Sequence, residues 1–363
     1  MDITKIDKNF ANSEITRSDI EWHQINQDAF ELTGVYYSEK DGQYLRMPKE
    51  IADNVNEGVS NLCTHTSGGR LRFRTNSPFF ALRVEQRYVG VMTNMTLMGS
   101  AGFSLYVNGE FVKCFAPLLN TSLYAKKAQE PVFYEGLFEN FPKHLNQTLD
   151  CELFFPLYYN VHDVYIGLQK GCELSKPKPL THQDQIIFYG SSITQGGCAT
   201  QPGNGYTNIL ARMLDAKVLN LGFSGSCRGE QLMAEYISSL PHSVFVLDYD
   251  HNAPTLQHLK DTHYAFYKKY REVCKDTPII FISKPDYNKN PKICDKHRRV
   301  VKQTYDKALA EGDKNVYYVD GRTLMGKDYF YCFVDTTHPN DFGFYKMAKR
   351  LYPILNKLLN KEN

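Results

Sequence analysis

The first half of the chain is dominated by short runs in which apolar and polar residues alternate. Residues 69–86 (GRLRFRTNSPFFALRVEQ) alternate in this way, and residues 102–115 have a hairpin pattern with Asn108-Gly109 as the two-residue turn. The segment 149–161 continues the alternation. Few windows in this half carry a helical period, and many short strands separated by turn residues predict a β-sandwich or jelly roll.

The second half has a different pattern, in which short apolar runs alternate with longer segments of helical period. This pattern is typical of βαβ units, which place a parallel sheet between layers of helices. It predicts an α/β domain built on a five-stranded parallel sheet. The expected strands are 185–189, 217–221, 243–248, 278–283 and 315–320, and the expected helices are 206–214, 229–240, 256–274, 293–311 and 342–359.

The change of pattern coincides with the proline-rich segment KPKP at 176–179. Each proline fixes its own φ and disfavours the helical region for the residue before it, so this segment is expected to be an extended linker. A chain of 363 residues is long enough for two to three domains. We therefore expect a β domain over 1–175, a linker over 176–184 and a catalytic α/β domain over 185–363.

Charge and composition exclude several classes of function. Lys and Arg total 42 against 40 Asp and Glu, and no basic run suggests a nucleic-acid partner. No stretch approaches the roughly 20 apolar residues of a membrane span, and the first 22 residues lack the apolar core of a signal peptide. The nine cysteines are scattered and contain no CxxC pair, which favours reduced thiols over disulfides or a zinc knuckle. These features predict a cytoplasmic protein that acts on a small substrate, with no membrane partner.

The carboxyl ends of parallel strands meet at one edge of a sheet, where such folds bind their ligands. Gly190-Ser191-Ser192 follows the first expected strand and leads towards a helix. A serine on such a turn exposes its hydroxyl next to unpaired backbone N–H groups, which suits a nucleophile that forms an oxyanion. Two alternatives are a simple helix cap and a phosphate cradle, although the lysine of a P-loop is missing.

Three further segments follow later strands of the same sheet. The second strand is followed by a glycine-rich turn containing Gly225, and the third by a segment in which Asn252 offers a side-chain amide or, alternatively, an Asx turn before proline. Near the end of the chain, Asp335 lies three residues before His338. An aspartate at this spacing can orient the imidazole and stabilise its charged form, although a surface Asp–His pair is the alternative.

The four segments together, in this order, resemble the SGNH (GDSL-like) hydrolases. Their blocks correspond here to GSSITQG with Ser192, GFSGS with Gly225, DHNAP with Asn252, and DTTHPND with Asp335 and His338. The resemblance covers about 185–360 and implies a flavodoxin-like fold, an acyl-enzyme mechanism and no metal or organic cofactor. It assigns Ser192 as nucleophile, His338 as general base and Asp335 as its orienting acid, with an oxyanion hole made by Ser192, Gly225 and Asn252.

The chain departs from the family pattern at two places. Ser191 stands where the first block usually has aspartate, and Asn252 lacks both the glycine and the following acid of the third block. In the first half, residues 102–106 and the segment PLYYNV at 156–161 resemble the GxDLY-type β domain that precedes some SGNH hydrolases, with Ser104 in place of the usual aspartate. Similar two-domain carbohydrate acetyl esterases pack this domain against the catalytic one.

These resemblances predict a serine esterase that removes short acyl groups, acetyl above all, from a carbohydrate such as an acetylated oligosaccharide. One alternative is a lipase or thioesterase-like acylhydrolase of the same superfamily, and another is a carbohydrate-binding protein without activity. A third alternative is a divalent-metal hydrolase, because carboxylates and imidazoles are competent metal ligands. Its ligands would be Asp248, Asp250, His251, Asp335 and His338.

Overall fold

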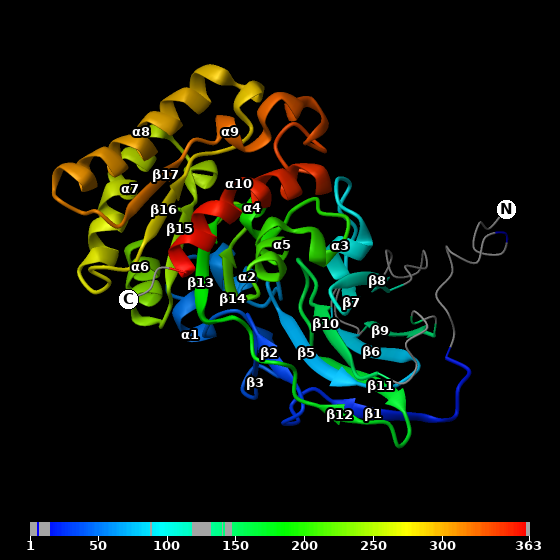
Figure 1. The fold of residues 1–363 in the computed structure, drawn as a ribbon. Helices are drawn as coiled ribbons and strands as arrows, with labels where there is room; N and C mark the ends of the chain where they lie inside the picture. Colours follow the sequence, from blue (N-terminus) through cyan, green and yellow to red (C-terminus); the bar gives the residue numbers. More distant parts are fainter. Residues whose placement is uncertain are drawn as a thin grey trace.

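The computed structural model describes residue 6 and residues 15–87, 89–117, 132–139, 141 and 147–360 (Figure 1). Within these ranges the chain forms a β-rich half followed by an α/β half. In the expected linker 176–184, residues 176–181 have no regular secondary structure, whereas residues 182–184 already belong to strand β13 (His182–Gly190). The proposed domain limits themselves stay a prediction.

The β-rich half consists of two antiparallel sheets that share one apolar core. The hairpin expected at Asn108-Gly109 is present, with φ of 50° and 83° at the two turn residues. The strands of one sheet are, in order, β1 (Ile20–Gln24), β11 (Asp163–Gln169), β6 (Phe80–Gln86) and β9 (Val132–Phe138). Those of the other are β12 (Leu174–Ser175), β5 (Arg70–Thr75), β10 (Leu149–Phe154), β7 (Phe103–Val107) and β8 (Glu110–Phe115), with β2 (Glu31–Thr33) beside β5. A separate hairpin joins β3 (Tyr36–Ser38) to β4 (Gln43–Leu45).

The α/β half confirms the predicted five-stranded parallel sheet between helices. The strands are β13 (His182–Gly190), β14 (Ala216–Gly222), β15 (Val244–Asp248), β16 (Ile279–Ile282) and β17 (Val316–Val319), in the order β14-β13-β15-β16-β17. All four strand pairs are parallel. This order is the flavodoxin-like one, in which the first strand lies between the second and third.

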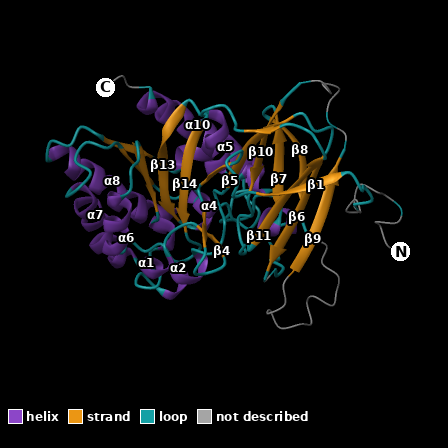
Figure 2. Ribbon diagram, turned by 90° about the horizontal axis from the view of Figure 1, so that it is seen from below, coloured by secondary structure: helices purple, strands orange, loops and turns teal. Residues whose placement is uncertain are grey.

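The helices cover both faces of this sheet (Figure 2). Because side chains of a strand alternate between faces, Ile186 and Phe188 of β13 pack under one layer and Ile187 and Tyr189 under the other. The first layer contains α5 (Tyr206–Met213) and α10 (Asp341–Leu359); the second contains α6 (Gln231–Ser239), α7 (Leu256–Arg271) and α8 (Pro291–Ala310). The short helices α4 (Ser192–Gln195) and α9 (Arg322–Met325) complete this half.

Three short helices interrupt the β-rich half, and the strand pattern did not predict them. They are α1 (Lys49–Ala52), α2 (Glu57–Leu62) and α3 (Leu97–Ala101). Ala52 and Val59 are fully buried in the core under α6 and α7, and Ala101 is fully buried in the core under α5 and α10. The first half of the chain therefore contributes residues to both cores of the α/β half.

A buried cation reinforces this contact between the halves. Arg46 is only 2% exposed and donates through its guanidinium to the carbonyl oxygens of Asn220, Gly222 and Leu62 at 2.9, 2.7 and 2.7 Å. Carbonyl groups at the end of a strand lack a ladder partner, and a guanidinium satisfies them. Arg46 thus fixes the carboxyl end of β14, immediately before the turn that contains Gly225.

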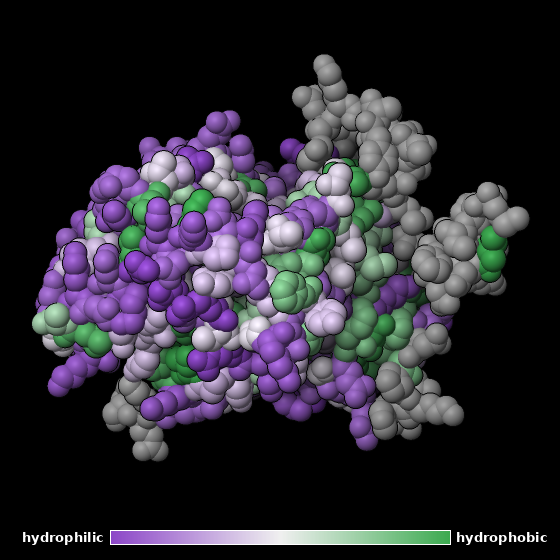
Figure 3. All heavy atoms as spheres, turned by 90° about the horizontal axis from the view of Figure 1, so that it is seen from above, coloured by the Kyte–Doolittle hydropathy of each residue, from purple (hydrophilic) through white to green (hydrophobic). Residues whose placement is uncertain are grey.

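Polar residues spread over the visible face of the α/β half (Figure 3). Among the described residues, no helix has the length and apolar character needed to cross a membrane. All nine cysteines fall inside the described ranges, and all are free thiols.

Candidate active site

The predicted nucleophile lies on the turn between β13 and α4. Ser192 is the first residue of α4, and the Ser191 hydroxyl caps this helix by accepting the N–H of Ile193 at 3.2 Å. Ser191, which replaces the usual acid, therefore acts here as a hydroxyl cap. A side chain at Gly190 would lie 2.1 Å from the Thr194 hydroxyl, so the turn requires glycine. Ser192 is 7% exposed, with its backbone N–H in the first helical turn, where no intrahelical acceptor exists.

The structure brings Ser192, His338 and Asp335 into a continuous hydrogen-bonded chain. Ser192 Oγ lies 2.8 Å from His338 Nε2, and His338 Nδ1 lies 2.8 Å from Asp335 Oδ2. The two ring nitrogens face different partners, so the ring can accept the serine proton at Nε2 while Nδ1–H donates to the carboxylate.

A tight turn allows Asp335 to reach an imidazole only three residues away. Thr336 has a φ of 67°, which is rare for a β-branched residue, and Val334 N–H donates to the His338 carbonyl at 2.9 Å. Asp335 Oδ1 also accepts the backbone N–H groups of Thr337 and His338, at 3.1 and 2.8 Å. The backbone of this turn therefore holds the carboxylate in place beside the ring that the same turn carries.

Asp335 is held in its charged form. Partial burial raises the pKa of Asp335, but hydrogen bonds from the His338 backbone, the His338 ring and Asn94 outweigh burial, so that the net pKa lies well below the usual range. The carboxylate therefore stays ionised at neutral pH.

Gly225 and Asn252 lie on neighbouring turns at the same edge of the sheet. Gly225 has a φ of 67°, and the Asn252 amide donates through Nδ2 to the Phe223 carbonyl at 3.0 Å. The N–H of Phe223 donates to the carbonyl of Gly190 at 2.9 Å, which ties this turn to the nucleophile turn. Asn252 Nδ2 carries two hydrogens, and the bond to Phe223 uses one of them.

Gln195 joins the nucleophile turn to the Gly225 turn, a role that the sequence did not indicate. Its side chain is fully buried, its Oε1 accepts the N–H of Ser224 at 2.9 Å, and its Nε2 donates to the Leu157 carbonyl at 3.1 Å. The His65 ring lies 3.3 Å from the same Nε2. Leu157 and His65 come from the β-rich half, so that half supports the turn next to Gly225.

Asn94 is a second residue of the site that the sequence did not indicate. Its Nδ2 donates to Asp335 Oδ2 at 2.7 Å across 241 residues of sequence. It lies in an irregular segment between β6 and α3, and the glycosylation-type triplet Asn94-Met95-Thr96, the one pattern that includes it, does not indicate a catalytic role.

Two family models match nearly the whole chain. One, described as the GDSL-like Lipase/Acylhydrolase family, matches residues 183–356; the other, GxDLY, described as the N-terminus of Esterase_SGNH_hydro-type, matches residues 20–174. The α/β half of the chain belongs to the GDSL-like lipase/acylhydrolase family. Both resemblances inferred from the sequence blocks are thereby confirmed.

Solved structures agree with this GDSL-like assignment over the full length. A candidate GDSL-like lipase from Bacteroides ovatus is 26% identical, with a TM-score of 0.80 over 94% of this chain and 98% of that one. The salicylyl-acyltransferase SsfX3 from a tetracycline biosynthetic pathway is 21% identical, with a TM-score of 0.75 over 95% and 99% of the two chains. A family two carbohydrate esterase from Clostridium thermocellum, solved with cellohexaose, is 16% identical, with a TM-score of 0.60 over 91% and 99%. No curated protein matches the chain significantly. Family membership and fold together support an acylhydrolase.

The residues of the metal alternative do not converge in this GDSL-like fold. Asp248 accepts hydrogen bonds from Thr194 and Tyr206 at 3.1 and 3.2 Å, and burial raises its pKa well above the usual range. Asp250 accepts the N–H of Lys284 at 3.2 Å, and His251 pairs with Asp286 at 3.1 Å. Among the described residues, the group of side chains close enough to hold a metal ion contains none of these three, so the proposed five-ligand set does not form.

Within the described ranges, one group of three metal-binding side chains is found: Cys198, Asp335 and His338, whose ligand atoms lie within 4.8 Å of one another. Two of these residues are already hydrogen-bonded to each other. Burial raises the pKa of the Cys198 thiol to about 12, which keeps it protonated. This group therefore does not resemble a ready metal site.

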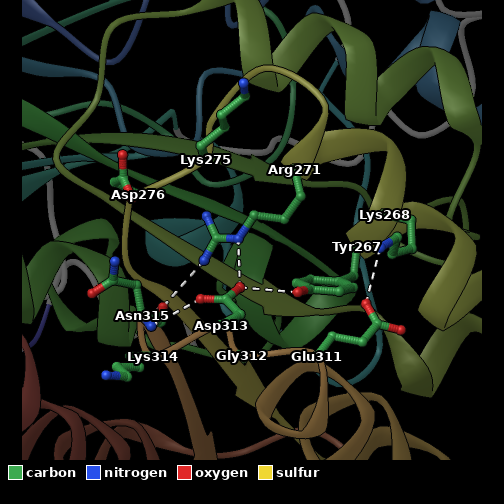
Figure 4. A pocket seen from close by; sticks show the side chains of 10 residues that line it. All are labelled: Tyr267, Lys268, Arg271, Lys275, Asp276, Glu311, Gly312, Asp313, Lys314 and Asn315. Carbon is green, nitrogen blue, oxygen red and sulfur yellow. Dashed lines mark hydrogen bonds and ion pairs between the residues drawn. The ribbon is translucent and has the colours of Figure 1, made fainter.

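A cavity of about 540 Å³ lies at the opposite edge of the GDSL-like sheet (Figure 4). It is bordered by the ends of α7 and α8 and by residues just before β16 and β17. Four of its seven charged side chains form ion pairs: Arg271 pairs with Asp313 at 2.7 Å, and Lys268 pairs with Glu311 at 2.9 Å. Because ligands of such folds bind at the carboxyl edge, the candidate site is the one at Ser192.

Proposed function

We propose that the protein is a serine esterase that hydrolyses short-chain esters through an acyl-enzyme intermediate, with an acetylated carbohydrate as substrate. The observation that carries this proposal is the 2.8 Å contact between Ser192 Oγ and His338 Nε2. A hydroxyl in contact with an oriented imidazole is the arrangement that activates a serine nucleophile.

In the first half-reaction, Ser192 Oγ attacks the ester carbonyl while its proton moves to His338 Nε2. The tetrahedral intermediate collapses, the bond to the leaving alcohol breaks, and His338 returns the proton to the alcohol oxygen. Water then attacks the acyl-serine in the same way and releases the carboxylic acid. Asp335 stabilises the charged imidazole at both stages without taking a proton.

The backbone N–H groups of Ser192 and Gly225 and the side-chain amide of Asn252 are proposed to hold the oxyanion. All three come from turns at the carboxyl edge of the sheet, and the bond from Asn252 to the Phe223 carbonyl orients the amide. Oriented donors of this kind stabilise the charge that develops in the transition state.

The acetyl and carbohydrate assignments are supported by structural neighbours. Besides the Clostridium thermocellum esterase, an acetyl xylan esterase from Butyrivibrio proteoclasticus shares the fold with a TM-score of 0.58 over 93% of this chain. Hydrolysis rates on acetylated oligosaccharides and on aryl esters of increasing acyl length test this part. Equal or faster rates on long acyl chains would replace the acetyl preference with a lipase-like one.

A second candidate function is acyl transfer, because an acyltransferase shares the fold with the higher TM-score of 0.75. The two reactions use the same acyl-enzyme and differ in whether water or an alcohol accepts the acyl group. Measuring free acid and new ester in the presence of alcohol acceptors separates them. New ester as the main product at low acceptor concentration would favour the transferase.

Labelling with an organofluorophosphonate tests the nucleophile directly and separates an enzyme from a binding protein. We expect the wild type and Ser239→Ala, a change on the surface of α6, to be labelled and active. Ser192→Ala is expected to lose both labelling and ester hydrolysis while it keeps its melting temperature. A Ser192→Ala variant with wild-type hydrolysis would refute the proposal. The cytoplasmic location stays a prediction.

A further inference from the structure

We infer that Asn94 of the β-rich half is a positioning residue for catalysis, which holds the Asp335 carboxylate in the orientation that His338 requires. This inference rests on the proposed serine-esterase function. It means that one half of the chain supplies the nucleophile, base and acid, while the other half fixes the acid in place.

The Asp335 carboxylate is surrounded by four hydrogen-bond donors. Oδ1 accepts two backbone N–H groups of its own turn, from Thr337 and His338. Oδ2 accepts from His338 Nδ1 at 2.8 Å and from Asn94 Nδ2 at 2.7 Å. Asn94 is therefore the donor to this carboxylate that comes from outside the catalytic turn, and it shares its acceptor atom with the catalytic imidazole.

Asn94 is held near Asp335 by anchors on both sides of it. Val89 and Met95 are buried in the core under α5 and α10, at 8% and 7% exposure, and Met92 and Met95 form a β-bridge around Asn94. On the other side, the Thr96 hydroxyl accepts the N–H of Gly99 and donates to the Thr200 carbonyl at 2.5 Å. The segment that carries Asn94 is thus fixed to the α/β half at several points.

The helix that follows Asn94 packs directly against the loop after the nucleophile. A side chain built on Gly99 of α3 would lie 2.0 Å from the carbonyl oxygen of Ala199, so glycine is needed for this approach. Ala199 follows Cys198, whose thiol lies within 4.8 Å of the ligand atoms of Asp335 and His338. The α3 segment consequently touches both the nucleophile loop and the catalytic acid.

A neutral donor on Oδ2 has two effects. It restricts rotation of the Asp335 carboxylate, so Oδ2 already faces the ring before the reaction. A carboxylate free to rotate would have to lose conformational entropy to reach this orientation. It also shares the negative charge of Oδ2, which moderates the attraction between this oxygen and the imidazolium. The first effect predicts a change in kcat, and the second predicts a change in the pH dependence.

The experiment compares Asn94→Ala and Asn94→Asp with the wild type and with Thr93→Ala, an exposed neighbour on the same segment. Hydrogen bonds to a charged group correspond to about 10- to 100-fold in rate, so we expect Asn94→Ala to lower kcat by that factor with KM within about twofold. Asn94→Asp keeps the shape but adds a carboxylate next to Oδ2. It should move the acid limb of the kcat/KM profile to higher pH by about one unit or more, because a second negative charge stabilises the protonated ring.

The outcomes separate this inference from the proposed function. If the wild type is neither labelled by the fluorophosphonate nor active, the serine-esterase function itself fails. If the wild type is active and both Asn94 variants keep its kcat and its pH profile, the inference fails alone. It also fails if Thr93→Ala lowers kcat as much as Asn94→Ala does, since the whole segment and not the Asn94 amide would then be responsible.

A readout without turnover supplements the kinetics. The NMR resonance of the His338 Nδ1–H proton reports on its bond to Asp335 Oδ2. We expect this resonance to shift in Asn94→Ala and to stay at its wild-type position in Thr93→Ala. An unchanged resonance in Asn94→Ala would show that the amide does not influence the Asp335–His338 pair and would overturn the inference.

Discussion

The Asp335 carboxylate accepts two hydrogen bonds from His338, one from its backbone and one from its ring. One carboxylate oxygen accepts the backbone N–H of His338 at 2.8 Å, and the other accepts the ring Nδ1–H, also at 2.8 Å. The positive φ of Thr336 makes this closed arrangement possible over only three residues. The catalytic acid therefore fixes the ring and, at the same time, the turn that carries the ring.

Replacing this carboxylate by a neutral amide is expected to lower kcat by about 10³- to 10⁴-fold. Asp335→Asn keeps the size of the side chain but no longer stabilises the charged imidazole, and its amide favours the wrong ring tautomer. Steady-state hydrolysis of an aryl acetate measures the effect. Asp261→Asn, an exposed acid on α7, should behave as wild type. Retention of more than a tenth of the wild-type kcat in Asp335→Asn would contradict the assignment of Asp335.

Asn252→Ala is expected to lower kcat by about 100-fold while leaving measurable activity. Losing one oxyanion donor typically raises the barrier by about 3 kcal/mol, and the two backbone N–H groups remain. Asn54→Ala is a matched control, because Asn54 also donates to a backbone carbonyl, that of Glu50 at 2.7 Å, on an exposed helix end. A change in KM with constant kcat would assign Asn252 to substrate binding and exclude it from the oxyanion hole.

Chelators are expected to leave the hydrolysis rate unchanged. The proposed steps use only Ser192, His338 and Asp335, and the carboxylates of Asp248 and Asp250 have hydrogen-bond partners within the fold. Incubation with EDTA, followed by an ester assay and a fluorophosphonate inhibition assay, checks this. Activity that disappears with EDTA and returns with one divalent cation would revive the metal-hydrolase alternative.

The five parallel strands could be predicted because each is a short apolar run buried on both faces. A short continuous apolar run predicts a buried strand from its own residues, without information about the rest of the chain. Ser192 and His338 could be predicted because each follows a strand or precedes a helix within a recognisable block. The structure places them 2.8 Å apart across 146 residues of sequence.

Asn94 and Gln195 could not be predicted, because their roles depend on partners distant in sequence. The Asn94 amide donates to the carboxylate of Asp335, 241 residues later in the chain. The Gln195 side chain is held in part by its hydrogen bond to the carbonyl of Leu157, a residue of the other half of the chain. Helices α1 and α2 were missed for a related reason. They have four and six residues, too few to show a helical period, and they are stabilised by packing against the α/β core.

Ser104→Ala is expected to destabilise the protein without changing the chemistry. Ser104 is fully buried in β7, and its hydroxyl accepts the N–H of Gly203 in the α/β half at 3.2 Å. Leaving this N–H without a partner costs about 1–3 kcal/mol of unfolding free energy. Denaturant unfolding should show a lower midpoint for Ser104→Ala than for Ser239→Ala, with kcat/KM of the folded enzyme unchanged. Equal midpoints would show that the hydroxyl contributes nothing to the contact between the halves.

Acidification is expected to destabilise the fold through a buried histidine of α7. His263 is 1% exposed, its Nδ1 lies 2.8 Å from the Thr304 hydroxyl, and burial lowers its pKa from 6.5 to about 3. In the unfolded chain the ring binds a proton near pH 6.5, whereas in the folded protein it stays neutral down to about pH 3. Between these values the unfolded state binds more protons, so the unfolding free energy falls as the pH falls, by at most about 1.4 kcal/mol per pH unit for this group.

His263→Phe keeps an aromatic ring beside Tyr249, whose ring centroid lies 5.5 Å from that of His263, but it cannot be protonated. The variant is expected to be less stable than wild type at pH 7.5, because the Thr304 hydroxyl loses its hydrogen bond with the His263 ring and keeps the longer one, at 3.5 Å, to the Val300 carbonyl. The difference should narrow steadily between pH 6.5 and pH 4.5, since only the wild type is destabilised by protonation of its unfolded state at this position. Urea unfolding at several pH values measures both slopes, and His23→Phe, a half-buried histidine of β1, is the control. Parallel slopes for wild type and His263→Phe would mean that His263 binds protons equally well in the folded and the unfolded protein, contrary to the effect of its burial.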